Sequence, residues 1–307
     1  MKNFPLVSIV IAAYNAESTI EETLKSVFNQ TYPNIEIVVV DDYSNDHSID
    51  VINNYKNNHD NISFYQNPSN KGCGFTKRRA ASLGKGSIMG FLDPDDTLLP
   101  FAVELMVQAH NSDNRLSLVT SSHFVCDEQL QIKREAYGAC AIPANENYLT
   151  YGKGVTQFSS FKTKYYQQTE GINEGFKRAV DQDLYYKLEE VGNLSYIPQP
   201  LYKYRIHEGG ISNLKNLAKA RYWMVKAKEA AYYRRLKLKH IKNISQSHLK
   251  SWWSILYATK AGVALGTRKY GAAVCWLGKS IITSPVDRFT WFKIQSIMIH
   301  LKPRWIK

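Results

Sequence analysis

The sequence lacks the features of membrane-spanning and disulfide-bonded proteins. No uninterrupted apolar run reaches about 18 residues, so no transmembrane helix is expected. The first residues lead straight into a strand-like segment without an apolar signal core. The cysteines form no Cys-x-x-Cys pair and no histidines cluster, so neither a disulfide framework nor a zinc site is indicated. We therefore expect a protein of the reducing cytoplasm, with buried or idle thiols at Cys73, Cys126, Cys140 and Cys275.

Acidic residues are nearly absent from the C-terminal third of the chain. Residues 214–307 contain 20 lysines and arginines but only two acidic residues, Glu229 and Asp287, and they hold all six tryptophans. Residues 1–213 carry the remaining 19 basic and 25 acidic residues. The chain has 307 residues, 44% of them hydrophobic, which suffices for two domains or for one domain with an appendage. The charge asymmetry predicts two regions with different roles.

The basic region, residues 214–307, has a helical pattern in which lysine and arginine flank tryptophan and aliphatic residues. Such a composition is typical of helices that lie on an anionic bilayer. A helical subdomain packed on the main domain with a basic outer face is a second interpretation, and both can hold together. Nucleic acid also attracts cations and aromatic rings, but we expect no nucleic-acid partner.

Strand-like and helix-like segments alternate along the first 121 residues. Ser18 and Glu21 have the spacing of a capping box, which predicts a helix whose apolar face carries Ile20, Leu24 and Val27. This alternation is typical of a mostly parallel sheet covered by helices on both faces. The expected strands are Val7–Ala12, Ile35–Val40, Ile62–Tyr65, Ile88–Leu92 and Leu116–Ser121.

Three acidic residues follow one buried strand directly. Asp93, Asp95 and Asp96 leave the strand Ile88–Leu92 at its carboxyl end, where ligands bind in open α/β sheets. Pro94 restricts the backbone between the first two acids. Carboxylate oxygens are the ligands that Mg²⁺ and Mn²⁺ prefer, so Asp93 and Asp95 are candidates to hold a divalent metal on a diphosphate. A solvated acidic turn is the alternative.

Two further segments carry candidate binding residues. A glycine-bearing loop at residues 70–74 enters a helix with three consecutive cations, Lys77, Arg78 and Arg79, which suits a phosphate; a solvated basic helix start is the alternative. Asp181 and Asp183 begin another helix, where acids favour the helix dipole. That effect accounts for Asp183 and leaves Asp181 more ambiguous.

Several of these segments together resemble a family 2 glycosyltransferase of the GT-A fold. The resemblance covers roughly residues 5–213, and each motif is weak alone while the ordered set is specific. The basic region lies outside it. The matching segments are Val7–Asn15, Ser26–Pro33, Ile37–Ser44, Lys85–Gly86, Phe91–Asp96, Asp181–Leu184 and Tyr204–His207 with Ser212.

The resemblance implies a role for each candidate residue. Asp93 and Asp95 match the D-x-D motif that contacts ribose and metal, and Asp181 matches the catalytic base. The resemblance also implies metal binding by His207. The other implied contacts are with the nucleotide and its diphosphate, and they fall on Ala13, Tyr14, Asn15, Asp42, Lys77, Arg78, Arg205 and His207.

The sequence departs from the family pattern at three places. Ala13 stands where proline is frequent, and Val180 stands where a glutamate usually precedes the catalytic aspartate. The assignment of Asp181 therefore rests on spacing and on the Asp183–Leu184 pair that follows. Lys77 and Arg78 replace the usual Arg-Asn pair, so phosphate contacts there can differ.

We therefore predict a Rossmann-like GT-A domain at residues 1–213 and a helical region at 214–307. Residues 1–100 would bind the nucleotide sugar and residues 101–213 the acceptor. The expected activity is inverting, metal-dependent transfer of a hexosyl or N-acetylhexosaminyl group, with UDP as the nucleotide and Mn²⁺ or Mg²⁺ as the cation. The acceptor would be a glycan or lipid-linked glycan of surface polysaccharide synthesis at the inner membrane face. A sugar nucleotidyltransferase and a non-catalytic protein of the same fold are the alternatives.

Overall fold

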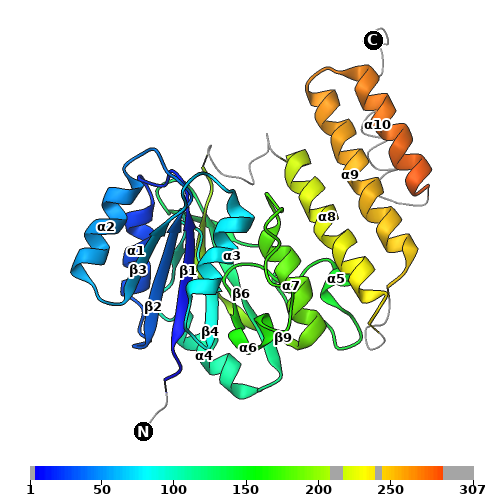
Figure 1. Cartoon of the computed structure of the whole chain (residues 1–307). Helices are drawn as coiled ribbons and strands as arrows, with labels where there is room; N and C mark the ends of the chain where they lie inside the picture. Colours follow the sequence, from blue (N-terminus) through cyan, green and yellow to red (C-terminus); the bar gives the residue numbers. More distant parts are fainter. Residues whose placement is uncertain (1–3, 208–216, 239–243, 286–307) are drawn as a thin grey trace. The chain divides into compact units, whose positions relative to one another are not determined.

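The computed structural model describes residues 4–207, 217–238 and 244–285 (Figure 1). The chain divides into two compact units, Met1–Gly210 and Ile211–Lys307. The predicted match at Ser212 and the predicted boundary after residue 213 lie outside the described residues, as do Trp291 and Trp305. The assignment of residues 1–100 and 101–213 to donor and acceptor stays a prediction.

The N-terminal half of the sheet is parallel, as the sequence predicts. Strand β1 pairs in parallel with β2 and β4, and β2 pairs in parallel with β3. The carboxyl ends of these strands therefore meet at one edge of the sheet, where the predicted site residues lie. The bounds are β1 (Val7–Ala13), β2 (Ile35–Asp41), β3 (Ile62–Gln66) and β4 (Ile88–Phe91).

The second half of the sheet is mixed. Strand β8 enters antiparallel between β4 and β6, while β9 runs parallel to β6 and pairs antiparallel with the short β5. The long strand β9 thereby returns the chain to the loop after β4. The bounds are β5 (Thr97–Leu98), β6 (Leu116–Cys126), β7 (Ile132–Glu135), β8 (Ser159–Lys162) and β9 (Asn193–Arg205).

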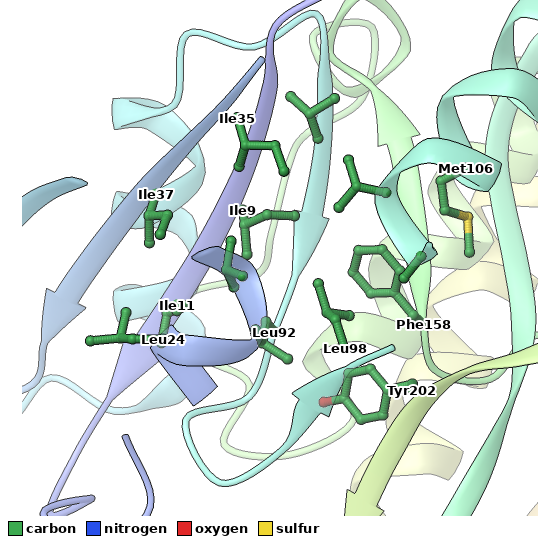
Figure 2. Packing of buried hydrophobic residues seen from close by; sticks show 14 of the residues in the cluster. Ile9, Ile11, Leu24, Ile35, Ile37, Leu92, Leu98, Met106, Phe158 and Tyr202 are labelled. Atoms are coloured by element: carbon green, nitrogen blue, oxygen red, sulfur yellow. The ribbon is translucent and has the colours of Figure 1, made fainter. Parts of the chain in front are cut away.

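Helices cover both faces of the sheet in this unit. Ile9 and Ile11 of β1 belong to the same buried cluster as Ile37 of β2 and Leu24 of α1 (Figure 2). The opposite face carries buried Val10 and packs against α3. Each such aliphatic side chain contributes roughly 1.5–3 kcal/mol by its burial. The bounds are α1 (Ile20–Phe28), α2 (Ser48–Asn58), α3 (Cys73–Leu83), α4 (Ala102–Ser112), α5 (Tyr148–Tyr151), α6 (Thr163–Tyr166) and α7 (Val180–Val191).

The predicted capping box at Ser18 and Glu21 is wrong. Helix α1 has Thr19 at its N-cap position without a side-chain cap, and Glu21 instead pairs with Lys25 one turn on. The hydroxyl groups of Thr19 and Thr23 donate to the carbonyl oxygen of Pro94 at 2.9 and 3.0 Å. The start of α1 is therefore held by the loop after β4, a tertiary contact that local spacing does not encode.

The second unit is helical in its described part, with α8 (Leu217–Arg235), α9 (Gln246–Gly266) and α10 (Tyr270–Thr283). Helix α9 packs against both of the others. Ser254 and Ser280 exchange hydrogen bonds at the α9–α10 contact, each hydroxyl donating to the other's carbonyl oxygen at 3.1 and 2.8 Å. No helix in the described ranges is long and apolar enough to cross a membrane.

Cations and tryptophans lie together in this unit. The Nζ of Lys260 is 4.3 Å from the ring centroid of Trp276, and that of Lys279 is 4.7 Å from it. Lys228 contacts Trp252 in the same way at 5.1 Å. Such contacts place charged groups against amphipathic rings.

Candidate active site

The loops after β1 and β2 are tied to each other at the carboxyl edge of the sheet. Asn15 has a φ of 48°, a left-handed conformation that asparagine tolerates. Its amide donates to the Ser44 hydroxyl at 2.9 Å, and its side-chain oxygen accepts from the Asn45 amide at 3.0 Å. Ala13 is buried at the end of β1, while the side chain of Tyr14 is 49% exposed. Tyr14 is therefore open to a ligand at this edge.

Asp42 organises the loop that leads into α3. One of its carboxylate oxygens accepts from the Asn67 side chain at 2.7 Å and from the Lys71 amide at 2.8 Å. The other accepts from the Gly72 amide at 2.8 Å, and the residue is only 4% exposed. The implied contact between Asp42 and a nucleotide base stays a prediction, because the structure commits this carboxylate to backbone amides.

The alternative of a solvated basic helix start is wrong for Lys77. Its side chain is 5% exposed and lies in the second turn of α3, where its Nζ is 2.9 Å from Asp93 and 2.9 and 3.0 Å from the two oxygens of Asp181. Arg78 remains exposed, donates to the Ile172 carbonyl at 3.0 Å and pairs with Glu174. The three consecutive cations therefore have separate environments.

Lys77 brings together two acids that are far apart in the sequence. Burial opposes its charge, but Asp181 and Asp93 outweigh burial and hold the pKa of Lys77 well above its usual value. Burial raises the pKa of Asp181, the charge of Lys77 opposes that rise, and the nearby charge of Asp93 adds to it. One cation for two carboxylates leaves an excess of negative charge, which favours binding of a further cation or proton.

Two backbone features bring α3, which carries Lys77, close to the segment that carries Asp181. Gly74 in α3 lies so close to residues 173–176 that a Cβ atom there would be 2.6 Å from the carbonyl oxygens of Asn173 and Phe176. Ala179, directly before α7, has a φ of 54°, a strained conformation for alanine at about 1–3 kcal/mol. It precedes the first turn of α7, which carries Asp181. The sequence shows neither feature as a site signal.

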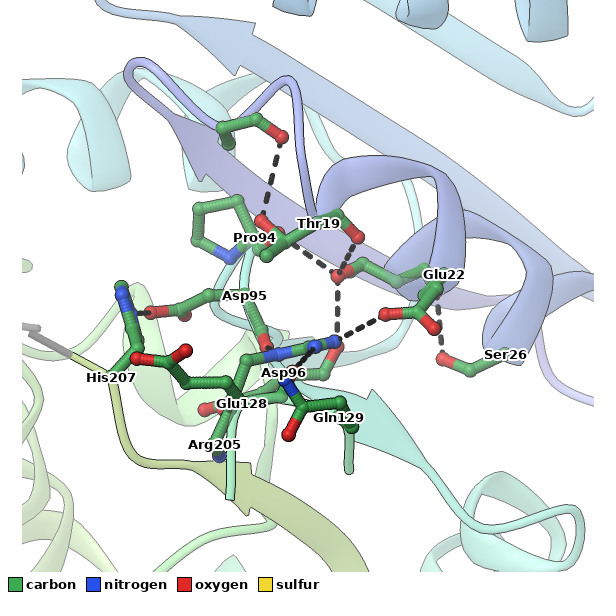
Figure 3. A network of polar contacts seen from close by, with 12 residues as sticks. Thr19, Glu22, Ser26, Pro94, Asp95, Asp96, Glu128, Gln129, Arg205 and His207 are labelled. Carbon is green, nitrogen blue, oxygen red and sulfur yellow. Dashed lines mark hydrogen bonds and ion pairs between the residues drawn. The ribbon is translucent and has the colours of Figure 1, made fainter. Parts of the chain in front are cut away.

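The loop after β4 is anchored to the end of β9 (Figure 3). Asp96 is 1% exposed and accepts hydrogen bonds from the Tyr202 hydroxyl and the Arg205 amide, both at 2.7 Å. Burial and the neighbouring acids raise its pKa well above the usual range. Sequence reasoning assigned Asp96 and Tyr202 no role, and the only signal for Asp96 was its place in the acidic run.

Asp95 and His207 face each other across this junction. The His207 Nε2 lies 2.8 Å from Asp95 Oδ2, with side chains 28% and 30% exposed. Burial, followed by the charge of Asp93, raises the pKa of Asp95, and the bond to His207 opposes that rise. These two predicted metal ligands are therefore adjacent and reachable from solvent.

Arg205 acts as an anchor in this structure. Its guanidinium donates to the Asp95 carbonyl at 2.7 Å, to the Glu128 carbonyl and to the Glu22 carboxylate at 2.6 Å. Its side chain is 5% exposed. A contact between Arg205 and a diphosphate stays a prediction, and it would require some of these bonds to be exchanged.

The explanation of Asp183 by the helix dipole is incomplete. Asp183 is buried and pairs with Lys187 one turn further along α7 at 2.9 Å. Lys187 also donates to the Gly171 carbonyl at 2.8 Å, which ties α7 to the preceding loop. Asp183 therefore faces the protein interior, while Asp181 faces Lys77.

The sequence that forms this site matches the model of a known protein family. The model for glycosyl transferase family 2 matches residues 8–185, more than half of the chain. The chain belongs to glycosyl transferase family 2. This membership confirms the predicted enzyme class, a glycosyltransferase, and the matched range includes Asp93 and Asp181.

Curated relatives of the family 2 chain include polysaccharide synthases. The chain is 34% identical over 217 residues to chondroitin synthase of Escherichia coli, covering 71% of this chain and 31% of that protein. It is 31% identical over 213 residues to hyaluronan synthase of Pasteurella multocida, covering 69% and 22%. The chain thus spans a third or less of the length of these relatives.

Solved structures confirm the GT-A fold class of this family 2 member. Staphylococcus aureus TarS residues 1–349 in complex with UDP superposes with a TM-score of 0.59 at 15% identity, covering 95% of this chain and 91% of that one. The mannosyltransferase PcManGT of Pyrobaculum calidifontis, in complex with GDP-Man and Mn²⁺, gives a TM-score of 0.60 at 14% identity, covering 98% and 82%.

The predicted metal ligands are compatible with a divalent cation only if substrate completes its coordination. Within the described ranges, no three His, Cys, Asp or Glu side chains converge closely enough to hold a metal by themselves. Mg²⁺ is usually bound through one or two carboxylates together with substrate phosphates rather than by an all-protein cage. Asp93 and Asp95, whose side chains are each 30% exposed, and His207 would be such a partial ligand set, and metal binding by them stays a prediction.

Proposed function

We propose that this chain transfers a sugar from a nucleoside-diphosphate sugar to a hydroxyl group of a glycan or lipid-linked glycan in polysaccharide synthesis, with inversion at the anomeric carbon. One observation carries the proposal: Lys77 holds Asp181 beside Asp93 at the edge of the sheet where parallel strands end. A base and a D-x-D motif in one site are what a single displacement needs. Family membership supports the reaction class.

Asp181 is the base in this proposal. An acceptor hydroxyl is a weak nucleophile until a base within hydrogen-bond reach takes its proton. The acceptor oxygen forms a bond to C1 of the sugar as the bond from C1 to the β-phosphate oxygen breaks, and the proton moves to Asp181. Its side chain is 19% exposed, so it is not fully closed off from solvent. The leaving group departs as a nucleoside diphosphate.

The negative charge that develops on the leaving diphosphate needs stabilisation. Asp93, Asp95 and His207 would hold a divalent cation, which supplies Lewis-acid stabilisation of that charge when bound. Arg78 is exposed, and contact with a phosphate would require it to exchange its bonds to Ile172 and Glu174. Tyr14, exposed after β1, can meet the nucleotide. Stabilisation of developing charge by preorganised groups is usually a large part of catalysis.

UDP is the proposed nucleotide. Two structures of S. aureus TarS are complexes, one with UDP and one with UDP-GlcNAc. A relative in Escherichia coli, named UDP-Glc:alpha-D-GlcNAc-diphosphoundecaprenol beta-1,3-glucosyltransferase WfaP, is 34% identical over 143 residues, covering 47% of this chain and 54% of that protein. These names support a UDP-sugar donor and a lipid-linked glycan acceptor. A neighbour with GDP-Man makes GDP the competing nucleotide.

A thermal-shift panel tests this proposal. The purified full chain is heated with UDP, GDP, CDP, TDP or CMP, each with and without Mn²⁺. A ligand at 100 times its Kd adds about 2.7 kcal/mol to the free energy of unfolding. A Mn²⁺-dependent shift with UDP supports the site and the donor class. A shift with another nucleotide corrects the donor, and no shift with any nucleotide contradicts the proposed site.

We propose that the second unit, which contains the basic region, contacts an anionic membrane surface. Vesicles of phosphatidylglycerol and phosphatidylcholine should co-sediment with the full chain, and binding should weaken with salt because exposed charges are screened. Replacing exposed lysines of this unit by glutamate should abolish binding; the set is Lys219, Lys237 and Lys250. Lysine-to-glutamate changes at exposed lysines of the first unit should leave most of the vesicle binding; that set is Lys56, Lys85 and Lys164. Equal loss in both sets would contradict a dedicated surface.

A further inference from the structure

Lys77 is nearly buried and lies between two carboxylates in this structure. A lysine ammonium group carries three N–H donors. They contact one oxygen of Asp93 at 2.9 Å and both oxygens of Asp181 at 2.9 and 3.0 Å, and the two Asp181 oxygens lie too close together to bind separate N–H groups. Because the Lys77 side chain is only 5% exposed, a phosphate could reach this nitrogen only if the residues around it moved. The geometry therefore argues against the phosphate contact that the sequence predicts for Lys77.

Lys77 is also held firmly itself. Its stem is buried in α3 above the ring of Phe91, whose centroid is 5.3 Å from Nζ. The next turn of α3 carries buried Ala80 and Ala81 against the sheet. At Gly74, α3 lies close against residues 173–176 of the loop that leads to α7. A buried ammonium group on a side chain that cannot move can fix the position of the carboxylates that it binds.

The two carboxylates differ in how they depend on Lys77. The backbone amide of Asp93 faces the Tyr202 hydroxyl at 3.4 Å, and its side chain is 30% exposed. Both carboxylate oxygens of Asp181 accept from the one Lys77 nitrogen. Two carboxylates this close repel each other unless a cation lies between them. Removal of Lys77 should therefore move Asp181.

We propose that Lys77 is a positioning residue that fixes the Asp181 carboxylate beside the D-x-D motif, and that it does not bind the donor diphosphate. This inference rests on the proposed function, since it assumes that Asp181 is the base. Its consequence is specific: loss of Lys77 lowers turnover and leaves nucleotide affinity nearly unchanged. Misplacing a catalytic group by about 1 Å can cost about 10²-fold in rate.

A double-mutant cycle with Asp181 tests the proposal. UDP release is measured with UDP-glucose and UDP-GlcNAc, and UDP affinity is measured by calorimetry with Mn²⁺. In the full chain, Lys77→Met should lower kcat by about 10²-fold and keep the Kd for UDP within about threefold. Lys77→Arg, which keeps the charge, should restore part of kcat. In the Asp181→Asn background, Lys77→Met should lower kcat little further, because both changes remove the same function.

Three outcomes would overturn the proposal. Independent, multiplying losses in the cycle would show that Lys77 acts without Asp181. A large loss of UDP affinity with kcat retained would make Lys77 a phosphate ligand. Full turnover in Asp181→Asn alone would remove the base and with it the proposed function, whereas the first two outcomes leave that function standing.

A structural measurement covers the case in which activity is too low or Lys77→Met folds poorly. Crystal structures of the wild-type chain and of Lys77→Gln, a neutral variant of similar length, show the Asp181 carboxylate directly. The proposal predicts that this carboxylate leaves its position beside Asp93 in the variant while Asp42 keeps its bonds to Lys71 and Gly72. An unmoved Asp181 would overturn the positioning role.

Discussion

The Nε2 atom of His207 lies 2.8 Å from Oδ2 of Asp95 and so joins the end of β9 to the loop after β4. The residues are 112 positions apart in the chain. A cation that binds both side chains must replace this hydrogen bond. The contact therefore holds two predicted metal ligands in place before any metal binds, which reduces the ordering cost of binding.

His207→Ala should weaken Mn²⁺-dependent UDP binding by about 10–100-fold, the usual effect of losing a group that supports a metal site. Calorimetric titration of UDP at fixed Mn²⁺ measures it. His47→Ala is the matched control, because His47 pairs with Asp50 at 2.9 Å on the exposed surface. Equal affinity in wild type and His207→Ala would remove His207 from the metal site.

Arg205→Met should destabilise the first unit by roughly 2–4 kcal/mol. The variant leaves the Asp95 and Glu128 carbonyls and the Glu22 carboxylate without their buried donor. Urea unfolding followed by far-UV circular dichroism measures the loss. Arg115→Met serves as control, since Arg115 is 78% exposed in its pair with Asp113 and should change stability by less than about 0.5 kcal/mol. Similar losses in the two variants would contradict the anchor role.

Gly74→Ala should lower both stability and turnover. The added methyl group would lie 2.6 Å from two carbonyl oxygens, so α3 must shift away from residues 173–176. Overpacking of this kind costs typically 1–3 kcal/mol, and the shift carries Lys77 away from Asp181. Gly271→Ala is the control, because nothing lies within 4 Å of a Cβ atom there. Normal turnover in Gly74→Ala would show that the α3–α7 distance is not critical.

The second unit should become more stable between pH 8 and pH 10.5. Burial, with the charge of Arg221 nearby, lowers the pKa of Lys228 from 10.5 to about 8. Between these values the unfolded chain binds the proton and the folded chain does not, so stability rises with pH. Lys228→Met should raise stability at pH 7 and flatten this dependence, while exposed Lys250→Met should do neither.

Tryptophan fluorescence during urea unfolding measures this effect selectively. All six tryptophans lie in the unit Ile211–Lys307, so the signal reports on that unit alone. A pH dependence in Lys228→Met equal to that of the wild type would assign the titration to another group.

Much of the fold could be predicted because local patterns determine it. The β-branched runs at β1 and β2 and the acids after β4 identify the parallel half of the sheet and its functional edge. The environments of single residues could not be predicted in the same way. The start of α1 is held by a hydrogen bond from the Thr19 hydroxyl to the carbonyl oxygen of Pro94, 75 residues away, and not by the local Ser18–Glu21 spacing.

The candidate site, like the fold, could be predicted only in part. Asp93, Asp95 and Asp181 follow from motif order, but the burial of Lys77 depends on how closely α3 packs against the rest of the unit, including residues 173–176 at Gly74. Arg78 and Arg79 follow Lys77 directly in the sequence, yet their side chains point to the Ile172 and Gln66 carbonyls. Packing between elements decides which of three consecutive cations enters the site.

The central claim is that Asp181 is the base of a glycosyl transfer. The most direct measurement compares wild type and Asp181→Asn in UDP binding with Mn²⁺ and in UDP release from UDP-glucose and UDP-GlcNAc. Asp183→Asn, which breaks the buried pair with Lys187, is the control and should lose stability while retaining turnover. We predict that Asp181→Asn binds UDP as the wild type does and loses about 10²–10⁴-fold in turnover. Unchanged turnover in Asp181→Asn would contradict the account.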